Sequence, residues 1–169
     1  MSINSIDPAT NLFKDDGSIP NNPKLPLLFY AGAFDDVTPE LIEETFSANE
    51  WGNGWWASVF PFPHYHAEAH EALGCFNGTA IIRLGGKKGI EQKVQPGDVV
   101  VIPAGVGHER LESTGDFTMV GAYPPGQSPD LQRGEPGERE WVAESIAKVP
   151  LPTADPVLGV DGPLMRAWR

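Results

Sequence analysis

The middle of the chain, residues 55–123, alternates short apolar runs with turn-forming residues, and this pattern constrains the fold more than any other feature. Turns such as Asn77-Gly78, Gly85-Gly86 and Pro96-Gly97-Asp98 separate the runs. Closely spaced short strands of this kind form antiparallel sandwiches or barrels. We therefore predict an all-β core with strands at 55–60, 64–66, 71–76, 79–84, 90–94, 99–102, 108–112 and 117–123.

The N-terminal flank has a different pattern. Residues 1–24 are rich in polar and turn-forming residues, so we expect an irregular arm, and the apolar run at 25–30 has the length of a strand. Thr38 is a good N-cap residue, and Pro39 suits the first helical position. The apolar stripe that follows predicts a helix over about 39–50.

The C-terminal flank returns to helical spacing. Val142, Ile146 and Val149 recur at intervals typical of a helix, which Pro150 would end. Residues 150–169 are rich in proline, and we expect them to be extended against the barrel or against a neighbouring subunit.

The chain of 169 residues is predicted to form one domain. A chain of this length buries roughly two-thirds of its unfolded surface in a single core. Residues 1–54 would form the N-terminal arm and helix, 55–123 the barrel core, and 124–169 the C-terminal helix and tail. No internal repeat and no apolar run of membrane-spanning length is visible.

Net charge limits the partners that we expect for this chain, and the cysteine count limits its disulfides. The 23 acidic and 12 basic residues give a net charge of −11, which repels phosphate backbones and anionic lipid. We therefore expect a small-molecule partner and neither nucleic acid nor membrane. Cys75 is the single cysteine, which excludes an internal disulfide, and the N-terminus lacks the features of a secretory signal. A cytoplasmic location is expected.

Three of the four histidines lie within the seven positions HYHAEAH, residues 64–70. In a strand, residues i and i+2 point to the same face, so His64 and His66 would lie side by side with Tyr65 facing away. Neutral imidazoles are ligands for zinc, iron, nickel and similar metals. The pair therefore forms half of a candidate metal site.

The spacing leaves the next ligand open. Glu71 lies five residues after His66, so it shares the face of His66 only if the intervening residues form a loop or bulge. His70 has the correct parity for an unbroken strand from His64. Both residues stay candidates on spacing alone.

A second set of polar residues lies in GDVVVIPAGVGHERLE, residues 97–112. A buried-looking strand is followed by a tight bend at 103–105, which delivers His108 onto the next strand in a well-defined position, as a metal ligand requires. Arg110 shares the parity of His108 and is a candidate contact for a substrate carboxylate. A salt bridge to an acidic residue such as Glu112 is the simpler interpretation.

These two segments resemble the two motifs of the cupin superfamily. The first is matched at His64, His66, Glu71 and Gly78, and the second at Gly97, Pro103, Gly105 and His108. The chain departs from the motifs where Ser58 replaces a glycine and Glu112 an asparagine. The similarity extends over nearly the whole chain to small bacterial single-domain cupins of the YjlB type, through segments such as DDGSIPNNPKLPLLFY, VGAYPPGQSPDL and ADPVLGVDGPL.

The resemblance implies an antiparallel jelly-roll barrel that binds one divalent transition metal per chain, whether Fe, Mn, Ni or Zn. Its ligands would be His64, His66, Glu71 and His108. The motif glycine, Gly78, fits the count from Glu71 and not from His70. His70 would then point outward or support the ligands from behind, with a role as ligand as the alternative.

Three imidazoles and one carboxylate leave one or two positions on an octahedral metal for water, dioxygen or substrate. We expect a mononuclear metal-dependent oxidoreductase, dioxygenase-like, acting on a small polar or carboxylate substrate. The alternatives are a metal-dependent sugar isomerase or epimerase and a non-catalytic cupin that binds a metabolite or metal. The resemblance and the long flanking arms also lead us to expect a homodimer.

Overall fold

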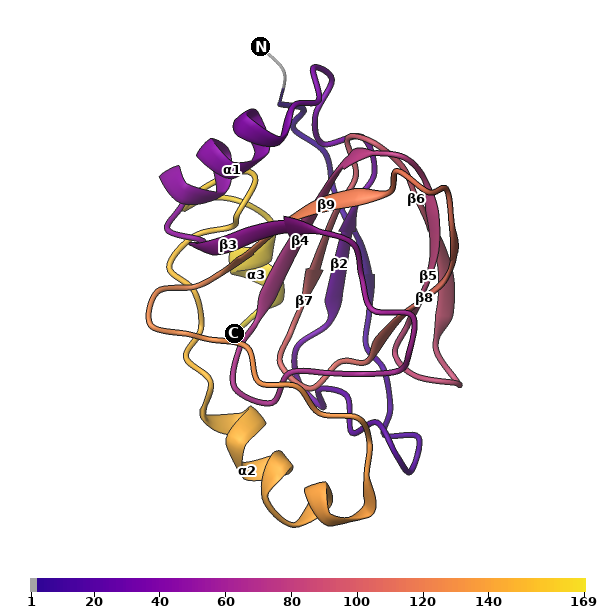
Figure 1. Cartoon of the computed structure of the whole chain (residues 1–169). Coiled ribbons are helices and arrows are strands. Elements are labelled where there is room, and N and C mark those ends of the chain that lie inside the picture. Colours follow the sequence, from indigo (N-terminus) through magenta and orange to yellow (C-terminus); the bar gives the residue numbers. More distant parts are fainter. Residues whose placement is uncertain (1–2) are drawn as a thin grey trace.

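The strands form two antiparallel sheets, as the computed structural model of residues 3–169 shows (Figure 1). The smaller sheet has the order β6-β5-β8 and contains β5 (Ala80–Leu84), β6 (Ile90–Val94) and β8 (His108–Ser113). The larger sheet has the order β1-β2-β7-β4-β9-β3. Its strands are β1 (Ala9–Asn11), β2 (Leu27–Tyr30), β3 (Gly52–Ala57), β4 (Glu71–Asn77), β7 (Val99–Ile102) and β9 (Thr118–Tyr123).

One hydrophobic cluster lies between the two sheets. Leu73 and Cys75 of β4 belong to it together with Ile82 and Leu84 of β5, because alternate residues of a strand point to opposite faces. Burial raises the pKa of the Cys75 thiol to about 12, so this residue is an inert small hydrophobe.

A second cluster covers the outer face of the larger sheet. Helix α1 (Pro39–Ala48) packs there through Ile42 and Phe46, and the Thr38 hydroxyl caps it by accepting the Leu41 N–H. Gly74 of β4 lets the helix approach closely, because a Cβ atom at this position would lie 2.6 Å from Cγ2 of Ile42.

The C-terminal segment completes this outer cluster (yellow in Figure 1). It contains α3 (Leu164–Ala167) and follows η1 (Pro136–Glu138) and α2 (Arg139–Lys148, orange in Figure 1). Val142 and Ile146 of α2 pack in a separate cluster with Tyr65. Trp168 is 3% exposed, and its indole N–H donates to the Pro26 carbonyl. Buried Asp155 accepts the hydroxyl of Tyr30 and the backbone N–H of Leu164. The tail therefore packs on the sheet of its own chain.

The predicted all-β class is confirmed in part: the chain is mostly β with antiparallel strands and a few helices, and it differs locally from the prediction. Strand β3 spans Gly52–Ala57 and not 55–60. Residues 64–66 form isolated bridges and no strand, because His64 pairs with His108 whereas Tyr65 pairs with Gln132. The arm contains the short strand β1, and the tail contains the helical turn α3.

The two sheets remain separate hydrogen-bonded units, so the strands of residues 3–169 do not close a continuous barrel. The jelly-roll barrel therefore stays a prediction. No helix in this described range is both long enough and apolar enough to span a bilayer.

Candidate metal centre

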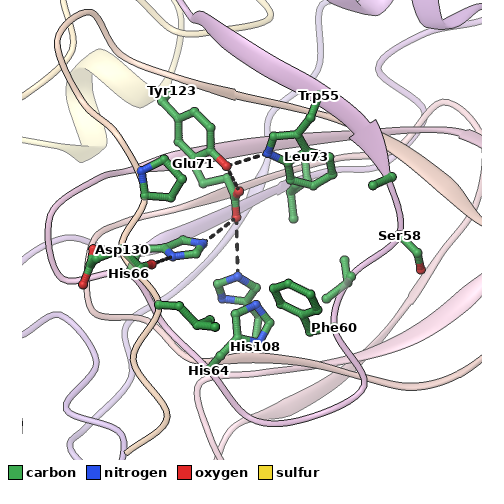
Figure 2. Close-up of a pocket in the computed structure, with 14 residues that line it drawn as sticks. Trp55, Ser58, Phe60, His64, His66, Glu71, Leu73, His108, Tyr123 and Asp130 are labelled. Carbon is green, nitrogen blue, oxygen red and sulfur yellow. Dashed lines mark hydrogen bonds and ion pairs between the residues drawn. The ribbon is translucent and has the colours of Figure 1, made fainter.

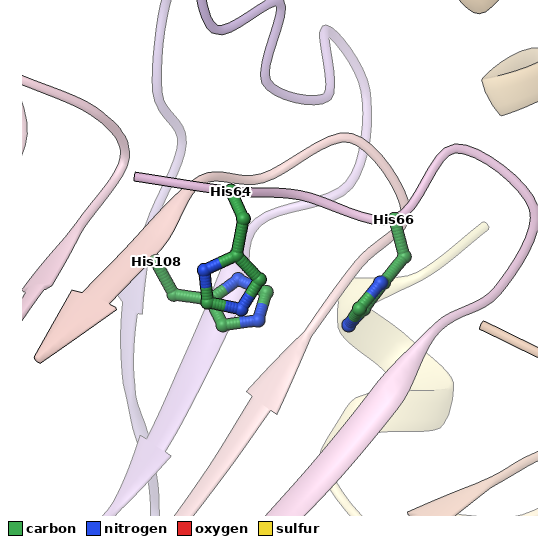
Figure 3. Close-up of side chains that lie close together, drawn as sticks. All are labelled: His64, His66 and His108. Carbon is green, nitrogen blue, oxygen red and sulfur yellow. The ribbon is translucent and has the colours of Figure 1, made fainter. Parts of the chain in front are cut away.

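Three imidazoles and one carboxylate converge in a cavity (Figure 2). His64 and His66 come from the segment between β3 and β4, His108 begins β8, and Glu71 begins β4. Each histidine offers a ring nitrogen, and these three atoms lie within 4.8 Å of one another (Figure 3). Oε1 of Glu71 lies 3.4 Å from Nε2 of both His66 and His108.

Backbone hydrogen bonds hold the two histidine segments together. His64 and His108 form an antiparallel bridge with N–H···O distances of 3.2 and 2.9 Å. The Gly105 N–H, in the bend before His108, donates to the carbonyl of His66 at 2.7 Å. Gly105 has a φ of +92°, a conformation that L side chains rarely adopt, so glycine is required in this bend.

All three histidines have their Nδ1 atom engaged by a backbone carbonyl. His64 Nδ1 lies 2.9 Å from the Phe62 carbonyl, His108 Nδ1 lies 3.1 Å from that of Val106, and His66 Nδ1 contacts that of Asp130. A carbonyl only accepts, so each Nδ1 must carry the proton. In the neutral imidazole this leaves the Nε2 lone pair free, which is the arrangement of metal-binding histidines.

The distances from Glu71 to two of the imidazoles also fit a metal ion. Two donor atoms that each lie about 2.1 Å from a common ion are about 3.0–3.4 Å apart for octahedral to tetrahedral angles. The separations of 3.4 Å between Glu71 and the imidazoles of His66 and His108 match this range.

Glu71 is buried and held by two aromatic residues (Figure 2). The Tyr123 hydroxyl donates to its Oε2 at 2.7 Å, and the Trp55 indole N–H donates to the Tyr123 oxygen at 2.6 Å. Burial alone would raise the pKa of Glu71, but His66 and His108 hold it well below its usual range. The carboxylate is therefore ionised, with Oε1 left facing the histidines.

The histidines differ in their titration. Burial lowers the pKa of His64 to about 3, so this ring is neutral. Burial acts in the same direction on His66, but the adjacent Glu71 carboxylate outweighs it and raises the pKa of His66 above its ordinary value. Without metal, His66 is therefore the histidine that pairs electrostatically with the Glu71 carboxylate.

A cavity of about 400 Å³ opens beside this cluster. Apart from the four residues of the cluster, it is lined by Trp55, Ala57, Ser58, Val59, Phe60, Leu73, Tyr123, Pro129, Asp130 and Leu131.

Two comparisons with known proteins agree on the family. The family model described as Cupin matches residues 59–115. The chain is 45% identical to the uncharacterized protein YjlB of Bacillus subtilis strain 168 over 159 residues. The aligned region covers 94% of this chain and 95% of that protein. The chain belongs to the cupin family.

Three solved structures are also similar to this cupin. The plu4264 protein of Photorhabdus luminescens is 20% identical, with a TM-score of 0.34 over 66% of this chain and 84% of its own. Procruciferin, an 11S globulin of Brassica napus, is 14% identical, with a TM-score of 0.40 over 78% and 37%. RmlC of Streptococcus suis, solved with dTDP-D-xylose, is 11% identical, with a TM-score of 0.36 over 74% of each chain. Similarity at this level implies nothing about the reaction of this cupin.

His70 lies on the opposite face of the larger sheet from the cluster. It is fully buried against Trp168, with ring centroids 4.8 Å apart, and its Nδ1 accepts the Ala104 N–H at 2.9 Å. The loop at residues 67–70 resets the register, so Glu71 and not His70 faces the other histidines.

The remaining sequence-based candidate, Arg110, is engaged elsewhere. Its Nε donates to the Val59 carbonyl at 2.9 Å and its guanidinium also donates to the Ser113 hydroxyl at 3.0 Å, and it does not line the cavity described above. A role in substrate binding stays a prediction.

The sequence patterns singled out neither Tyr123 nor Trp55 as a site residue. Both residues line the cavity and orient Glu71. The one available signal was Gly121, where a Cβ atom would lie 2.4 Å from the Trp55 ring, but such a glycine in a strand indicates close packing and no particular function.

Tyr123→Phe is expected to weaken metal binding about 10- to 100-fold without unfolding this cupin, because residues that orient metal ligands contribute effects of this size. The substitution removes the hydroxyl that fixes Oε2 of Glu71 and keeps the ring. Competition with a chromophoric chelator measures the affinity. Tyr65→Phe is the matched control, since Tyr65 donates to Glu138 away from the cavity; equal affinities for the two variants would contradict the expectation.

Proposed function

We propose that this cupin binds one divalent transition metal through His64, His66, Glu71 and His108, and that it is a mononuclear oxidoreductase of the dioxygenase type acting on a small polar or carboxylate substrate. The observation that carries the proposal is the shared tautomer of the three histidines. The three imidazoles and the ionised Glu71 carboxylate line one cavity, with Oε1 of Glu71 3.4 Å from Nε2 of His66 and of His108.

When bound, a redox-active metal at such a site supplies Lewis acidity and electron transfer with dioxygen. The residues of the chain orient the metal ligands and limit the access of water. The carbonyls of Phe62, Asp130 and Val106 orient the imidazoles, and Tyr123 orients Glu71. The apolar walls of the cavity limit the access of water to the reacting groups.

His64→Ala is expected to lose the stoichiometric metal that wild type retains, because it removes a neutral imidazole from the cluster. Elemental analysis of protein purified without an affinity tag measures the metal. A variant with full metal content would contradict the ligand set.

Oxygen consumption tests the reaction class. Wild type loaded with iron or manganese is expected to consume dioxygen with its substrate, and His64→Ala is not. Turnover under strictly anaerobic conditions would instead favour an isomerase or epimerase. A metal-loaded protein that turns over nothing under either condition would favour a binding protein.

We also propose that residues 1–169 act as a single cupin domain, that the protein is a homodimer and that it works in the cytoplasm. A light-scattering mass equal to one chain would contradict the dimer.

A further inference from the structure

The cavity beside the histidine cluster has no positively charged side chain. Of the 14 described residues that line it, none is lysine or arginine. The charged side chains besides the imidazoles are Glu71 and Asp130, and both are acidic. Arg110, in the neighbouring strand β8, directs its guanidinium to the Val59 carbonyl and to Ser113.

Two of the polar groups of the wall, Tyr123 and Asp130, are engaged within the protein, and the third, Ser58, is exposed and uncharged. The Tyr123 hydroxyl donates to Glu71 and accepts from Trp55. The Asp130 carboxylate accepts the backbone N–H groups of Ala67 and Glu68, which fixes the loop behind His66. Neither group is therefore available to stabilise a negative charge on a ligand.

Apart from Ser58, the other residues of the wall and its rim are apolar. Val59 and Leu73 lie inside, while Phe60 and Leu131 line the same cavity with 50% and 48% of their surface exposed. Exposed apolar residues next to a concave site favour a ligand that covers them, because its binding removes their surface from water.

Charge balance then limits what the cavity accepts. A divalent ion held by Glu71 and three neutral imidazoles leaves a single positive charge, which one anionic oxygen or sulfur donor of a ligand neutralises. A further negative charge on the ligand would be desolvated in an apolar cavity with no cation to pair it, which is costly.

Building on the metal site proposed above, we propose that the substrate is a chelating compound with at most one negative charge, located in the group that reaches the metal, and with an uncharged apolar body lying against Val59, Leu73 and Leu131. A lone carboxylate or enolate at the chelating end satisfies this description. Phosphorylated sugars, sugar nucleotides and dicarboxylates do not.

Two catechols of similar size test this substrate class. The probes are 4-methylcatechol and 3,4-dihydroxybenzoate, which share the chelating pair and differ by a methyl against a carboxylate. Their binding to protein loaded with Co²⁺ under argon is followed by the visible absorption of the metal. The affinity ratio is corrected by the ratio for free Co²⁺ in the same buffer.

Wild type is expected to prefer 4-methylcatechol by about 10-fold or more, because the extra carboxylate meets apolar and acidic side chains and no lysine or arginine. Leu131→Arg places a cation at the rim and is expected to reduce the preference to within about 3-fold, the scale of a partly exposed ion pair. Leu151→Arg is the matched control: Leu151 is 46% exposed but does not line the cavity, so the ratio should stay that of wild type.

The outcomes separate the two proposals. Failure to bind one Co²⁺ per chain would overturn the metal site and the substrate class together. If Co²⁺ binds but the two catechols bind equally, or the acid binds more tightly, the substrate class is wrong and the metal site stands. The same conclusion follows if Co²⁺ binds and neither catechol changes its spectrum.

Discussion

Glu71→Ala is expected to lower metal affinity by more than about 100-fold, since the loss even of groups that merely orient ligands costs about 10- to 100-fold. His70→Ala, one residue earlier, is expected to keep the metal. The two side chains leave the strand on opposite faces: Oε1 of Glu71 lies 3.4 Å from two imidazoles, whereas His70 packs against Trp168.

Elemental analysis and chelator competition on the two variants measure this difference. Glu68→Ala is the control for removing a carboxylate, because Glu68 is exposed and lies in the same loop. Circular dichroism checks that each variant is folded. Loss of metal from His70→Ala together with its retention in Glu71→Ala would show that the ligand assignment is wrong.

Acid is expected to destabilise the metal-free protein through His70. Burial lowers the pKa of His70 to about 4, against an ordinary value of 6.5. Between these two pH values the unfolded chain binds a proton at His70 and the folded chain does not. The contribution of neutral His70 to the free energy of unfolding is therefore complete above pH 6.5 and is lost as the pH falls toward 4. The linkage gives a loss of about 1.4 kcal/mol at pH 5.5 and about 3 kcal/mol once both states are protonated.

Urea unfolding of EDTA-treated protein between pH 7.5 and 4.5 measures this loss, and the comparison with His70→Gln isolates it. His64 has a lowered pKa and acts in the same direction. His66 has a raised pKa, so its stabilising contribution is present at low pH and is lost as the pH rises through that value. These two contributions cancel in the difference between wild type and variant. Parallel pH profiles for the two proteins would refute the role of His70.

Most strands and the pairing of His64 with His66 were predictable from the sequence because both depend on local periods, whereas Glu71 was assigned by the resemblance to cupins. Alternation within a strand placed His64 and His66 on one face, with Tyr65 on the other, where it packs with Ile19 and Val142. The order of strands in the two sheets and the absence of a strand at 64–66 depend on pairings between distant segments, which a local pattern does not contain.

The choice between His70 and Glu71 shows why local spacing was insufficient. The loop between them and His66 is held by Asp130, whose carboxylate accepts the N–H groups of Ala67 and Glu68 from more than 60 residues away. The link from Trp55 through Tyr123 to Glu71 likewise crosses three strands. Such contacts follow from sheet register, and spacing along the chain does not encode them.

The position of Trp168 has a consequence for biosynthesis. The outer cluster of the larger sheet combines Tyr30, Trp51 and Ala72 with Leu164 and Trp168. Helix α1 can cover its part of the outer face early, but the part under Leu164 and Trp168 stays uncovered until residue 168 has left the ribosome. During translation the growing chain exposes large apolar side chains, which is the condition in which chaperones bind and aggregation begins.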